Sequence, residues 1–321
     1  ASSYKQMNDY PRAVAAYEQL IQHGRLAGSL FSELMGISAL ALYAMERGEL
    51  HFAFETAAQG VERVERSGTL PPISAAVYGE LGGVAYHWYQ LEEAHRSLGK
   101  STQVSTVSGY SAAEIYHHVI RSRLAQVEND LETAVREAKK ATELMQADAP
   151  AAIREEVIAQ QVRVALLQDD PAAAEAALEP YGYRFQDILT APAIEAGQII
   201  NRPTGLIALS ALRIILYQGR DQGMLANMGQ GIELATWLIG QARKSHALPI
   251  VLEALLIRAQ MHAVLGEERA SQADATAAVA LAEPEGFIPI FLEEGRPVAK
   301  IFASLPGDDD LEDKQVDHAR K

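Results

Sequence analysis

Apolar residues recur along most of the chain at intervals of three and four positions, which is the spacing of one face of an α-helix. The stretch from Ile153 to Leu166 is a clear example, because it places Val157, Ile158 and Val162 on one face. The alternation of apolar and polar residues that marks a β-strand is nearly absent from the sequence. The pattern therefore predicts an all-α protein.

A second pattern occurs about seven times along the chain. A short polar or glycine turn precedes an acidic residue and then a small residue, the anchor, with a second small or apolar residue four positions later. The anchors are Ala13, Ala53, Ala94, Ala134, Ala174 and, in two weaker copies, Leu225 and Ser271. The first five lie 40 or 41 residues apart, and the last two intervals are 51 and 46 residues. This period predicts a repeated helix-turn-helix unit, and each unit must stack on its neighbours to bury its apolar face.

The boundaries of these helices follow from the turns. Short polar side chains accept hydrogen bonds from the free N–H groups at a helix start, so Asp, Asn or Gly should end the first helix of each unit and begin the second. We expect the first helices at 29–46, 75–88, 113–127, 151–167, 204–218 and 248–264. The second helices should begin near positions 10, 50, 91, 131, 171, 222 and 268. Each anchor should lie where the second helix approaches the first.

Two segments resemble the tetratricopeptide repeat. The sequence NDYPRAVAAYEQL (8–20) follows the second-helix half of that motif, and LGGVAYHWYQLEEAHRSL (81–98) keeps the small-residue turn of its first helix. A tetratricopeptide unit has about 34 residues, whereas the units here have 40 or more. The resemblance therefore implies a tetratricopeptide-like right-handed superhelix, a solenoid of about seven helix-turn-helix repeats.

The regular pattern breaks in two places. We expect residues 1–283 to form the solenoid, with an irregular insertion near 180–203 that is rich in Tyr and Pro. This insertion is either a structural plug over neighbouring repeats or a lid that contacts a ligand. Residues 284–305 read as a C-terminal extension with a short apolar run and a short helix. Residues 306–321 read as an acidic linker or tail.

The composition narrows the possible functions. The chain has 42 acidic and 28 basic residues, a net charge of −14, 54 alanines and no cysteine. The lack of cysteine excludes a disulfide scaffold and a cysteine zinc site, and the acidic balance argues against direct contact with nucleic acid. No apolar run in the sequence is long enough to span a membrane, and the N-terminus lacks the features of a signal peptide. We therefore expect a cytoplasmic piece of a longer protein.

The C-terminal stretch carries the most specific resemblance. Positions 278–297 contain an Ala-x-Ala-Leu-Ala-Glu-Pro-Glu-Gly-Phe sequence, an apolar run and a Leu-Glu-Glu-Gly-x-Pro sequence. This stretch is similar to the end of the sensor region in the large ATP-binding regulators of the LuxR type, the family of the bacterial maltose-operon activator. The matching residues are Ala278, Ala280, Leu281, Ala282, Glu283, Pro284, Glu285, Gly286, Phe287, Phe291, Leu292, Glu294, Gly295 and Pro297.

This resemblance implies that the chain is the signal-sensing repeat region of a transcriptional regulator. Its partner would be a small-molecule inducer or a regulatory protein, and the full-length protein would also self-associate. The ATP-binding and helix-turn-helix modules would lie outside this sequence, which has no phosphate-binding loop. We therefore expect no cofactor, no catalysis and no direct contact with nucleic acid or membrane. The alternative is a general tetratricopeptide-like scaffold that binds a peptide or a partner helix.

Basic side chains recur in several first helices, at Arg123, Arg163, Arg213 and Arg258. Arg123 and Arg163 are one repeat apart. The first helices line the concave surface of tetratricopeptide-like solenoids, so these guanidinium groups could form a ladder that recognises an anionic or polyhydroxylated ligand. The alternative is a set of ion pairs between neighbouring units, with acids such as Glu156 or Glu128.

Aromatic side chains complete the candidate ligand-binding set. By their spacing from the anchors, Tyr86 and His87 lie on the concave side, with Tyr116 at the start of the next first helix and Tyr217 one turn after Arg213. Aromatic faces with polar edges suit sugar-like or apolar ligands and also peptides. The alternative is that these aromatic residues belong to the core, as most aromatic residues at helical spacing do.

The sequence predicts neither a metal site nor an active site. His117 and His118 are consecutive, so their side chains point about 100° apart on a helix, and no third ligand is clearly placed beside them. No nucleophile elbow and no zinc-protease motif occurs in the sequence. The adjacent acids Glu293 and Glu294 are expected to be solvated.

Overall fold

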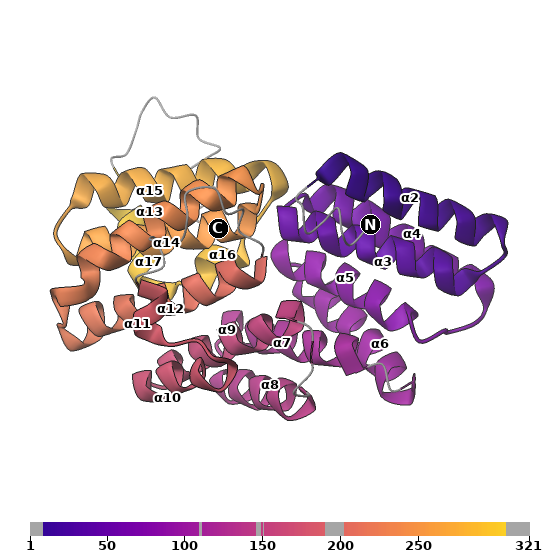
Figure 1. Ribbon diagram of the computed structural model, residues 1–321, viewed down its shortest axis with the longest axis horizontal. Coiled ribbons are helices and arrows are strands. Elements are labelled where there is room, and N and C mark those ends of the chain that lie inside the picture. The colour runs from indigo at the N-terminus through magenta and orange to yellow at the C-terminus, as the bar shows by residue number, and fades with distance from the viewer. Residues whose placement is uncertain (1–8, 109–110, 146–148, 150, 190–201, 306–321) are drawn as a thin grey trace.

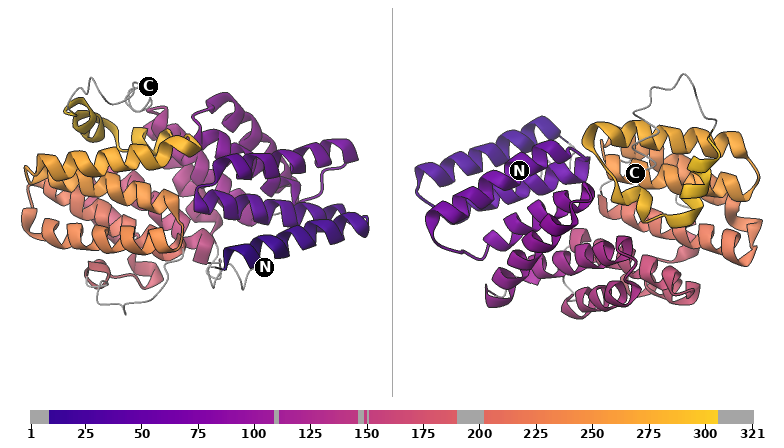
Figure 2. Two further views of the ribbon diagram at one scale, coloured as in Figure 1. Left: turned by 90° about the horizontal axis from the view of Figure 1, so that it is seen from above. Right: turned by 180° about the vertical axis from the view of Figure 1, so that it is seen from behind.

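The computed structural model describes residues 9–108, 111–145, 149, 151–189 and 202–305 of the chain. Within these ranges the secondary structure consists of α-helices and short 3-10 turns, with no β-strand (Figure 1). Consecutive helices pack as antiparallel pairs that stack along a curved path (Figure 2). The structure confirms the all-α, tetratricopeptide-like superhelix.

The first helices line the inside of this path. They are α3 (Leu30–Arg47), α5 (Ser74–His87), α7 (Ser111–Val127), α9 (Ala151–Leu167), α12 (Arg202–Gln222) and α14 (Leu248–Val264). Their bounds agree with the prediction to within two residues, except that α12 continues four residues further. The second helices are α2 (Tyr10–Leu26), α4 (Leu50–Ser67), α6 (Leu91–Ser108), α8 (Leu131–Leu144), α10 (Pro171–Ala176), α13 (Met228–Lys244) and α15 (Glu268–Ala282).

Short polar residues set the starts of the second helices, as predicted. The side chains of Asp9, Asp130 and Asp170 each accept a hydrogen bond from the backbone N–H three residues later, at 3.3, 3.0 and 2.9 Å. These bonds satisfy one of the free N–H groups at each helix start. In two of the turns the preceding residue, Asn129 or Asp169, has a φ near +60°, a conformation that short polar side chains tolerate.

The anchors lie at the closest approach of paired helices. Ala13, Ala53, Ala94, Ala134 and Ala174 are completely buried, and Ser271 is 3% exposed. The assignment of Leu225 as an anchor was wrong: it lies in the 3-10 turn η3 (Leu225–Asn227) and is 49% exposed. Because α13 starts only at Met228, Gly231 takes the anchor position, where an added Cβ would lie 2.9 Å from Cε of Met261. The interval from Gly231 to Ser271 is then the regular 40 residues.

The superhelix curls until its last units meet its first (Figure 1). Gly48, at the end of α3, packs so closely on α14 that a Cβ there would lie 2.7 Å from Cβ of Leu248. The N–H of His51 donates a hydrogen bond to the Glu285 carboxylate at 3.1 Å. The indole N–H of Trp88 donates a hydrogen bond to the backbone carbonyl of Glu285 at 2.9 Å. These contacts join residues that are more than 190 positions apart in the chain.

The segment after α15 is the least regular part of the described chain. It contains η4 (Glu283–Glu285), α16 (Pro289–Leu292) and α17 (Gly295–Ala303). Phe287 is completely buried, α16 contacts α5, and α17 packs against α14 and α15. The segment thus connects the end of the superhelix with its N-terminal half.

The insertion after α10 is described only in part. It contains η1 (Glu179–Tyr181) and α11 (Phe185–Leu189), which contacts α12 and α13. Residues 190–201 and the expected acidic tail at 306–321 lie outside the described residues.

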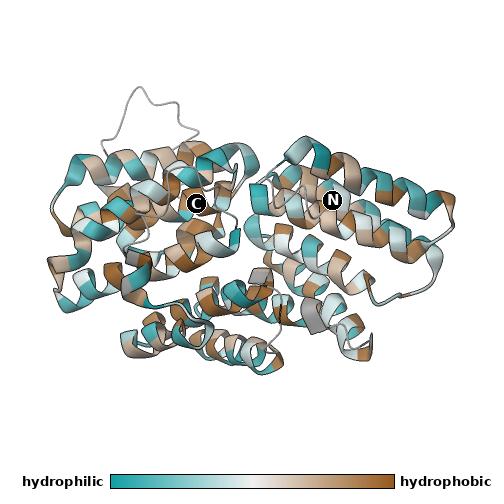
Figure 3. Cartoon of the chain, viewed as in Figure 1, coloured by the Kyte–Doolittle hydropathy of each residue, from teal (hydrophilic) through white to brown (hydrophobic). Residues whose placement is uncertain are grey.

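The outer helices have one buried face and one exposed face. In Figure 3 apolar and polar residues form alternating bands around helices such as α2 and α15. This is the pattern expected of helices that pack on one side only. Within the described ranges, no helix has the length and apolar character needed to cross a lipid bilayer.

Candidate functional site

Six charged side chains meet inside the superhelix, and we call them the central cluster. They come from five parts of the fold: Arg123 on α7, Arg163 on α9, Arg213 on α12, Glu253 on α14, and Glu293 and Glu294 in the turn between α16 and α17. The side chains are between 0 and 11% exposed. Buried charges are tolerated only when they are paired and hydrogen-bonded, so the geometry of the pairs decides what the site can do.

Glu293 is the most heavily bonded member of the cluster. Its two carboxylate oxygens accept hydrogen bonds from Nε and Nη2 of Arg123, both at 2.7 Å, and Nη1 of Arg163 lies 3.3 Å away. The Tyr86 hydroxyl donates to the same carboxylate. Burial alone would raise the pKa of Glu293, but the charges of Arg123 and Arg163 and these hydrogen bonds outweigh it and lower the pKa well below the ordinary value. Glu293 is therefore ionised at neutral pH.

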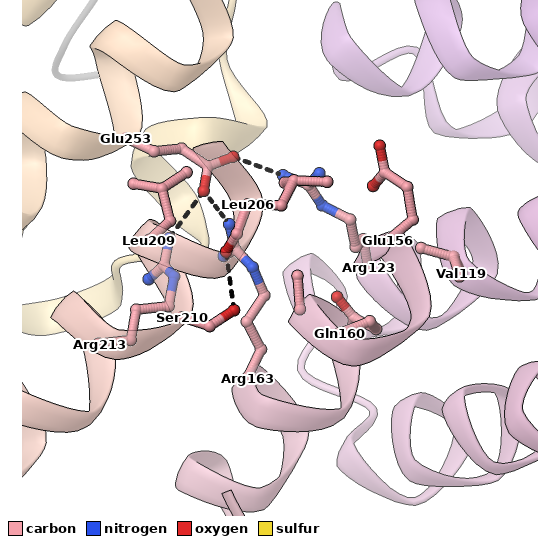
Figure 4. Close-up of a pocket in the computed structure, with 11 residues that line it drawn as sticks. Val119, Arg123, Glu156, Gln160, Arg163, Leu206, Leu209, Ser210, Arg213 and Glu253 are labelled. Atoms are coloured by element: carbon pink, nitrogen blue, oxygen red, sulfur yellow. Dashed lines mark hydrogen bonds and ion pairs between the residues drawn. The ribbon is translucent and has the colours of Figure 1, made fainter. Parts of the chain in front are cut away.

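Glu253 contacts all three arginines of the cluster. It is hydrogen-bonded to Arg163 and to Nη2 of Arg213 at 3.1 Å, and it lies 3.5 Å from Nη2 of Arg123 (Figure 4). Burial again acts to raise the pKa, but the three guanidinium groups lower it to about 2. Glu294 is the third acid of the cluster, and its carboxylate lies 2.7 Å from Nη1 of Arg213. The three cations thus face three anions.

Two spaces adjoin the central cluster. A cavity of about 10 Å³, large enough for roughly one water molecule, lies beside Gln160 and Arg163 (Figure 4). A pocket of about 260 Å³ lies on the other side, next to Glu293 and Glu294. The pocket is lined by Gln126, Arg163, Leu166, Leu167, Arg213, Leu216, Tyr217, Arg220, Glu293, Glu294, Gly295 and Pro297.

The structure brings three of the four predicted arginines together. Arg123, Arg163 and Arg213 meet in the cluster, where they pair with acids from other units. The acids suggested by the sequence have other partners, since Glu156 pairs with Arg202 and Glu128 with His95. Arg258 lies apart from the cluster and forms a bidentate pair with Asp274, at 2.6 and 2.7 Å.

The predicted aromatic residues lie around the cluster in different roles. Tyr86 is completely buried, and the guanidinium carbon of Arg123 lies 5.6 Å from its ring centroid. Tyr116 is partly buried, and burial raises the pKa of its hydroxyl. The Tyr217 hydroxyl donates to Asp169 at 3.2 Å, and its side chain lines the pocket.

His87 links α5 to the C-terminal segment. Its ring packs on Phe287 with 5.2 Å between the centroids, and its carbonyl accepts a hydrogen bond from the N–H of Ile288 at 3.1 Å. The ring nitrogen Nδ1 is buried without a hydrogen-bond partner in the described part of the chain. Burial and the charges of Arg123 and Arg202 lower the pKa of His87 to about 3, so its ring is neutral at physiological pH.

The acidic half of the cluster was missed in the sequence, and the expectation that Glu293 and Glu294 are solvated was wrong. Both residues are only 9% exposed. A signal for this half was present, because Glu253 follows Arg213 by 40 residues and Glu293 follows Glu253 by 40. The repeat period therefore continues through the acids as it does through the arginines.

A model of the family described as the MalT-like TPR region matches residues 2–307. The chain belongs to this family. The match confirms the predicted resemblance to the tetratricopeptide-like region of maltose-activator-like regulators.

We also compared the chain with curated proteins and with solved structures. No curated protein was found to match the sequence. Among solved structures, the chain is similar to a Signal Transduction ATPase with Numerous Domains (STAND) protein with a tetratricopeptide repeat sensor from Pyrococcus horikoshii, at 13% identity and a TM-score of 0.46. The similarity covers 99% of this chain and 45% of the other, so this chain spans less than half the length of that protein.

Proposed function

We propose that this chain is the signal-sensing region of a bacterial transcriptional regulator, and that a small inducer or a regulatory protein binds at the inner face of its superhelix. The observation that best supports the proposal is the central cluster. It connects first helices of four units with the turn that precedes α17, so a ligand acting there can change the position of the last segment relative to the rest.

The mechanism we propose is a population shift. A ligand changes the balance between two arrangements only if it binds one of them more tightly. One arrangement is the closed superhelix described above, and the other has the C-terminal segment released from α5 and α7. ATP-binding and helix-turn-helix modules outside this chain would respond to that difference. We assign neither ATP hydrolysis nor DNA contact to the chain itself.

A second candidate function is that of a peptide-binding scaffold. A groove of about 580 Å³ runs between α8 and α10 over α9. Its apolar lining includes Val135, Ala138, Ala165, Ala177 and Tyr181. Grooves between helices of this kind accept the apolar face of a partner helix. The groove favours a protein partner, whereas the pocket at the cluster favours a small molecule.

A thermal-shift screen of the 321-residue chain distinguishes the two. A ligand present at 100 times its Kd stabilises the folded state by about 2.7 kcal/mol, which raises the melting temperature by several degrees. We expect an inner-face ligand to stabilise the wild type but not Arg220→Met, because Arg220 lines the pocket and is partly exposed. Arg66→Met, which removes an exposed arginine on α4, is the matched control.

The groove has its own variant. Ala176→Trp, at an exposed position on α10 that lines this groove, should abolish binding of a helical peptide without changing the response to an inner-face ligand. If every variant responds to a ligand as the wild type does, neither surface binds it. If no small molecule or protein partner stabilises the wild type, the sensing proposal fails.

A further inference from the structure

The carboxylates of Glu293 and Glu294 reach the arginine cluster from outside the paired helices of the repeats. They belong to the turn between α16 and α17, whereas the three arginines belong to first helices of successive units. Glu293 is held by two hydrogen bonds of 2.7 Å from Arg123, and Glu294 by the 2.7 Å ion pair with Arg213. A short segment at the end of the superhelix thus supplies the anions for a site that the units assemble.

The guanidinium groups are arranged to bind oxyanions. A planar guanidinium with two parallel N–H donors matches a carboxylate or phosphate group, and Arg123 presents this bidentate geometry to Glu293. Without the two acids of the turn, three guanidinium groups would face the single carboxylate of Glu253. The cluster would then carry an uncompensated positive charge inside the superhelix.

The neighbouring pocket gives a ligand access to these groups. It shares Arg163, Arg213, Glu293 and Glu294 with the cluster and adds Arg220, whose side chain is 33% exposed. Its volume of about 260 Å³ lies just below the range of typical small-molecule sites. The pocket therefore suits a small molecule that reaches the acids and the arginines from solvent.

We propose that the central cluster is an anion-binding site whose internal occupant is the Glu293–Glu294 turn, and that a small molecule with two neighbouring oxyanion groups displaces this turn. The inference rests on the proposed sensing function and names the ligand class of that site. Exchange of one pair of oxyanions for another keeps the charge of the buried site balanced, so the desolvation cost is similar in both states. The ligand's additional contacts in the pocket then decide the equilibrium.

Displacement of the turn also removes what holds the C-terminal segment to α5. Three contacts join the C-terminal segment to Tyr86 and His87 on α5. They are the Tyr86–Glu293 hydrogen bond, the Ile288–His87 backbone bond and the Phe287–His87 ring contact. When Glu293 leaves the cluster, the first of these contacts is lost and the adjacent two are weakened. The anion would therefore open the superhelix at this contact.

The test begins with the double variant E293Q/E294Q of the 321-residue chain, which keeps the side-chain volumes and removes both charges. The probes are citrate and pyrophosphate, with sucrose as a neutral control, and binding is measured by calorimetry. The matched control is E62Q/E65Q, which changes the net charge equally through two exposed acids on α4. We expect the double variant to bind at least one anion about tenfold more tightly than E62Q/E65Q does. Tighter binding of citrate would indicate a ligand with carboxylate groups. Tighter binding of pyrophosphate would indicate a phosphorylated ligand.

Circular dichroism and a cooperative melting transition show whether E293Q/E294Q is folded. A folded double variant that binds both anions no better than E62Q/E65Q overturns the inference. If the double variant does not fold, amide hydrogen exchange of the wild type decides instead. Millimolar citrate or pyrophosphate should then increase exchange in residues 287–302, and unchanged exchange with both anions overturns the inference.

Failure of this inference differs from failure of the sensing function. Suppose that a neutral ligand or a protein partner stabilises the wild type, and that anions bind neither the wild type nor E293Q/E294Q. This result would leave the sensing function in place and exclude the anionic ligand class. If no ligand of any class stabilises the wild type, the sensing function itself fails.

Discussion

Two kinds of contact hold this superhelix together, and they differ in chemistry and range. Neighbouring helices meet through small anchors such as Ala53 and Ala134, which are completely buried. The C-terminal turn meets the first helices through charges, with Glu293 lying 170 residues from Arg123 and 130 from Arg163. The anchors hold the paired helices together, whereas the central cluster holds the end of the superhelix to its middle. A change at the cluster can therefore alter the overall shape without unfolding the units.

The largest effect is expected for Arg123→Met. This change leaves the Glu293 carboxylate buried without its bidentate partner, and removal of one partner of a buried ion pair costs about 3–5 kcal/mol. The measurement is the free energy of unfolding in urea. Arg66→Met is the control, because Arg66 and Glu62 are 70% and 58% exposed and such pairs contribute little. Equal losses in the two variants would show that the cluster contributes no more than a surface pair.

A smaller loss is expected when an anchor is enlarged. Ala134→Leu adds three carbon atoms at a completely buried position on α8, where overpacking costs about 1–3 kcal/mol. Hydrogen exchange in residues 287–302 should stay unchanged, because the effect remains within the units around α7 and α8. Ala172→Leu, at an exposed position on α10, is the control and should be close to neutral. Faster exchange in 287–302 for Ala134→Leu would contradict the separation of the two contacts.

The pH dependence of stability tests the contact between α5 and the C-terminal segment. His87 has a pKa of about 3 in the folded state, below its ordinary value of 6.5, because it is buried and faces Arg123 and Arg202. Between these values the unfolded chain binds a proton that the folded chain does not, so stability falls as the pH drops. The slope is about 1.4 kcal/mol per pH unit for one such group.

His87→Phe should remove this part of the slope between about pH 6 and pH 5. The stability that Glu253 contributes is lost below this window, as the pH falls from the ordinary glutamate pKa of 4.5 toward the folded-state pKa of about 2. Unfolding free energies in urea at several pH values give the slope. Leu26→Gln, at an exposed position on α2 without a titratable group, is the control and should leave the slope unchanged. An equal slope in wild type and His87→Phe would show that His87 is protonated in the folded state.

The helices and their pairing could be predicted from the sequence because they follow from local patterns. The spacing of apolar residues identifies the buried face of each helix. Asp130 and Asp170 begin their helices by accepting a hydrogen bond from the N–H only three residues later. The failure at Leu225 has a local cause. The backbone at Gly223 has a φ of +71°, and a 3-10 turn then delays α13 to Met228, so the anchor moves to Gly231.

Only the basic half of the candidate site was predicted from the sequence. Arg123, Arg163 and Arg213 recur at one face of successive first helices, and that regularity identified them. Glu293 and Glu294 sit in a Glu-Glu-Gly turn whose local sequence resembles a solvated loop. Their burial depends on the curl of the whole superhelix, which returns this turn to helices more than 100 residues away in the chain.

A double-mutant cycle between Arg123 and Glu293 tests the central claim most directly. The free energies of unfolding of Arg123→Met, Glu293→Gln and the double variant are compared with that of the wild type. If this pair holds the C-terminal turn to the first helices, the double variant will be more stable than the sum of the single losses predicts, by about 1.5 kcal/mol or more. Losses that add to within about 0.5 kcal/mol would contradict the account.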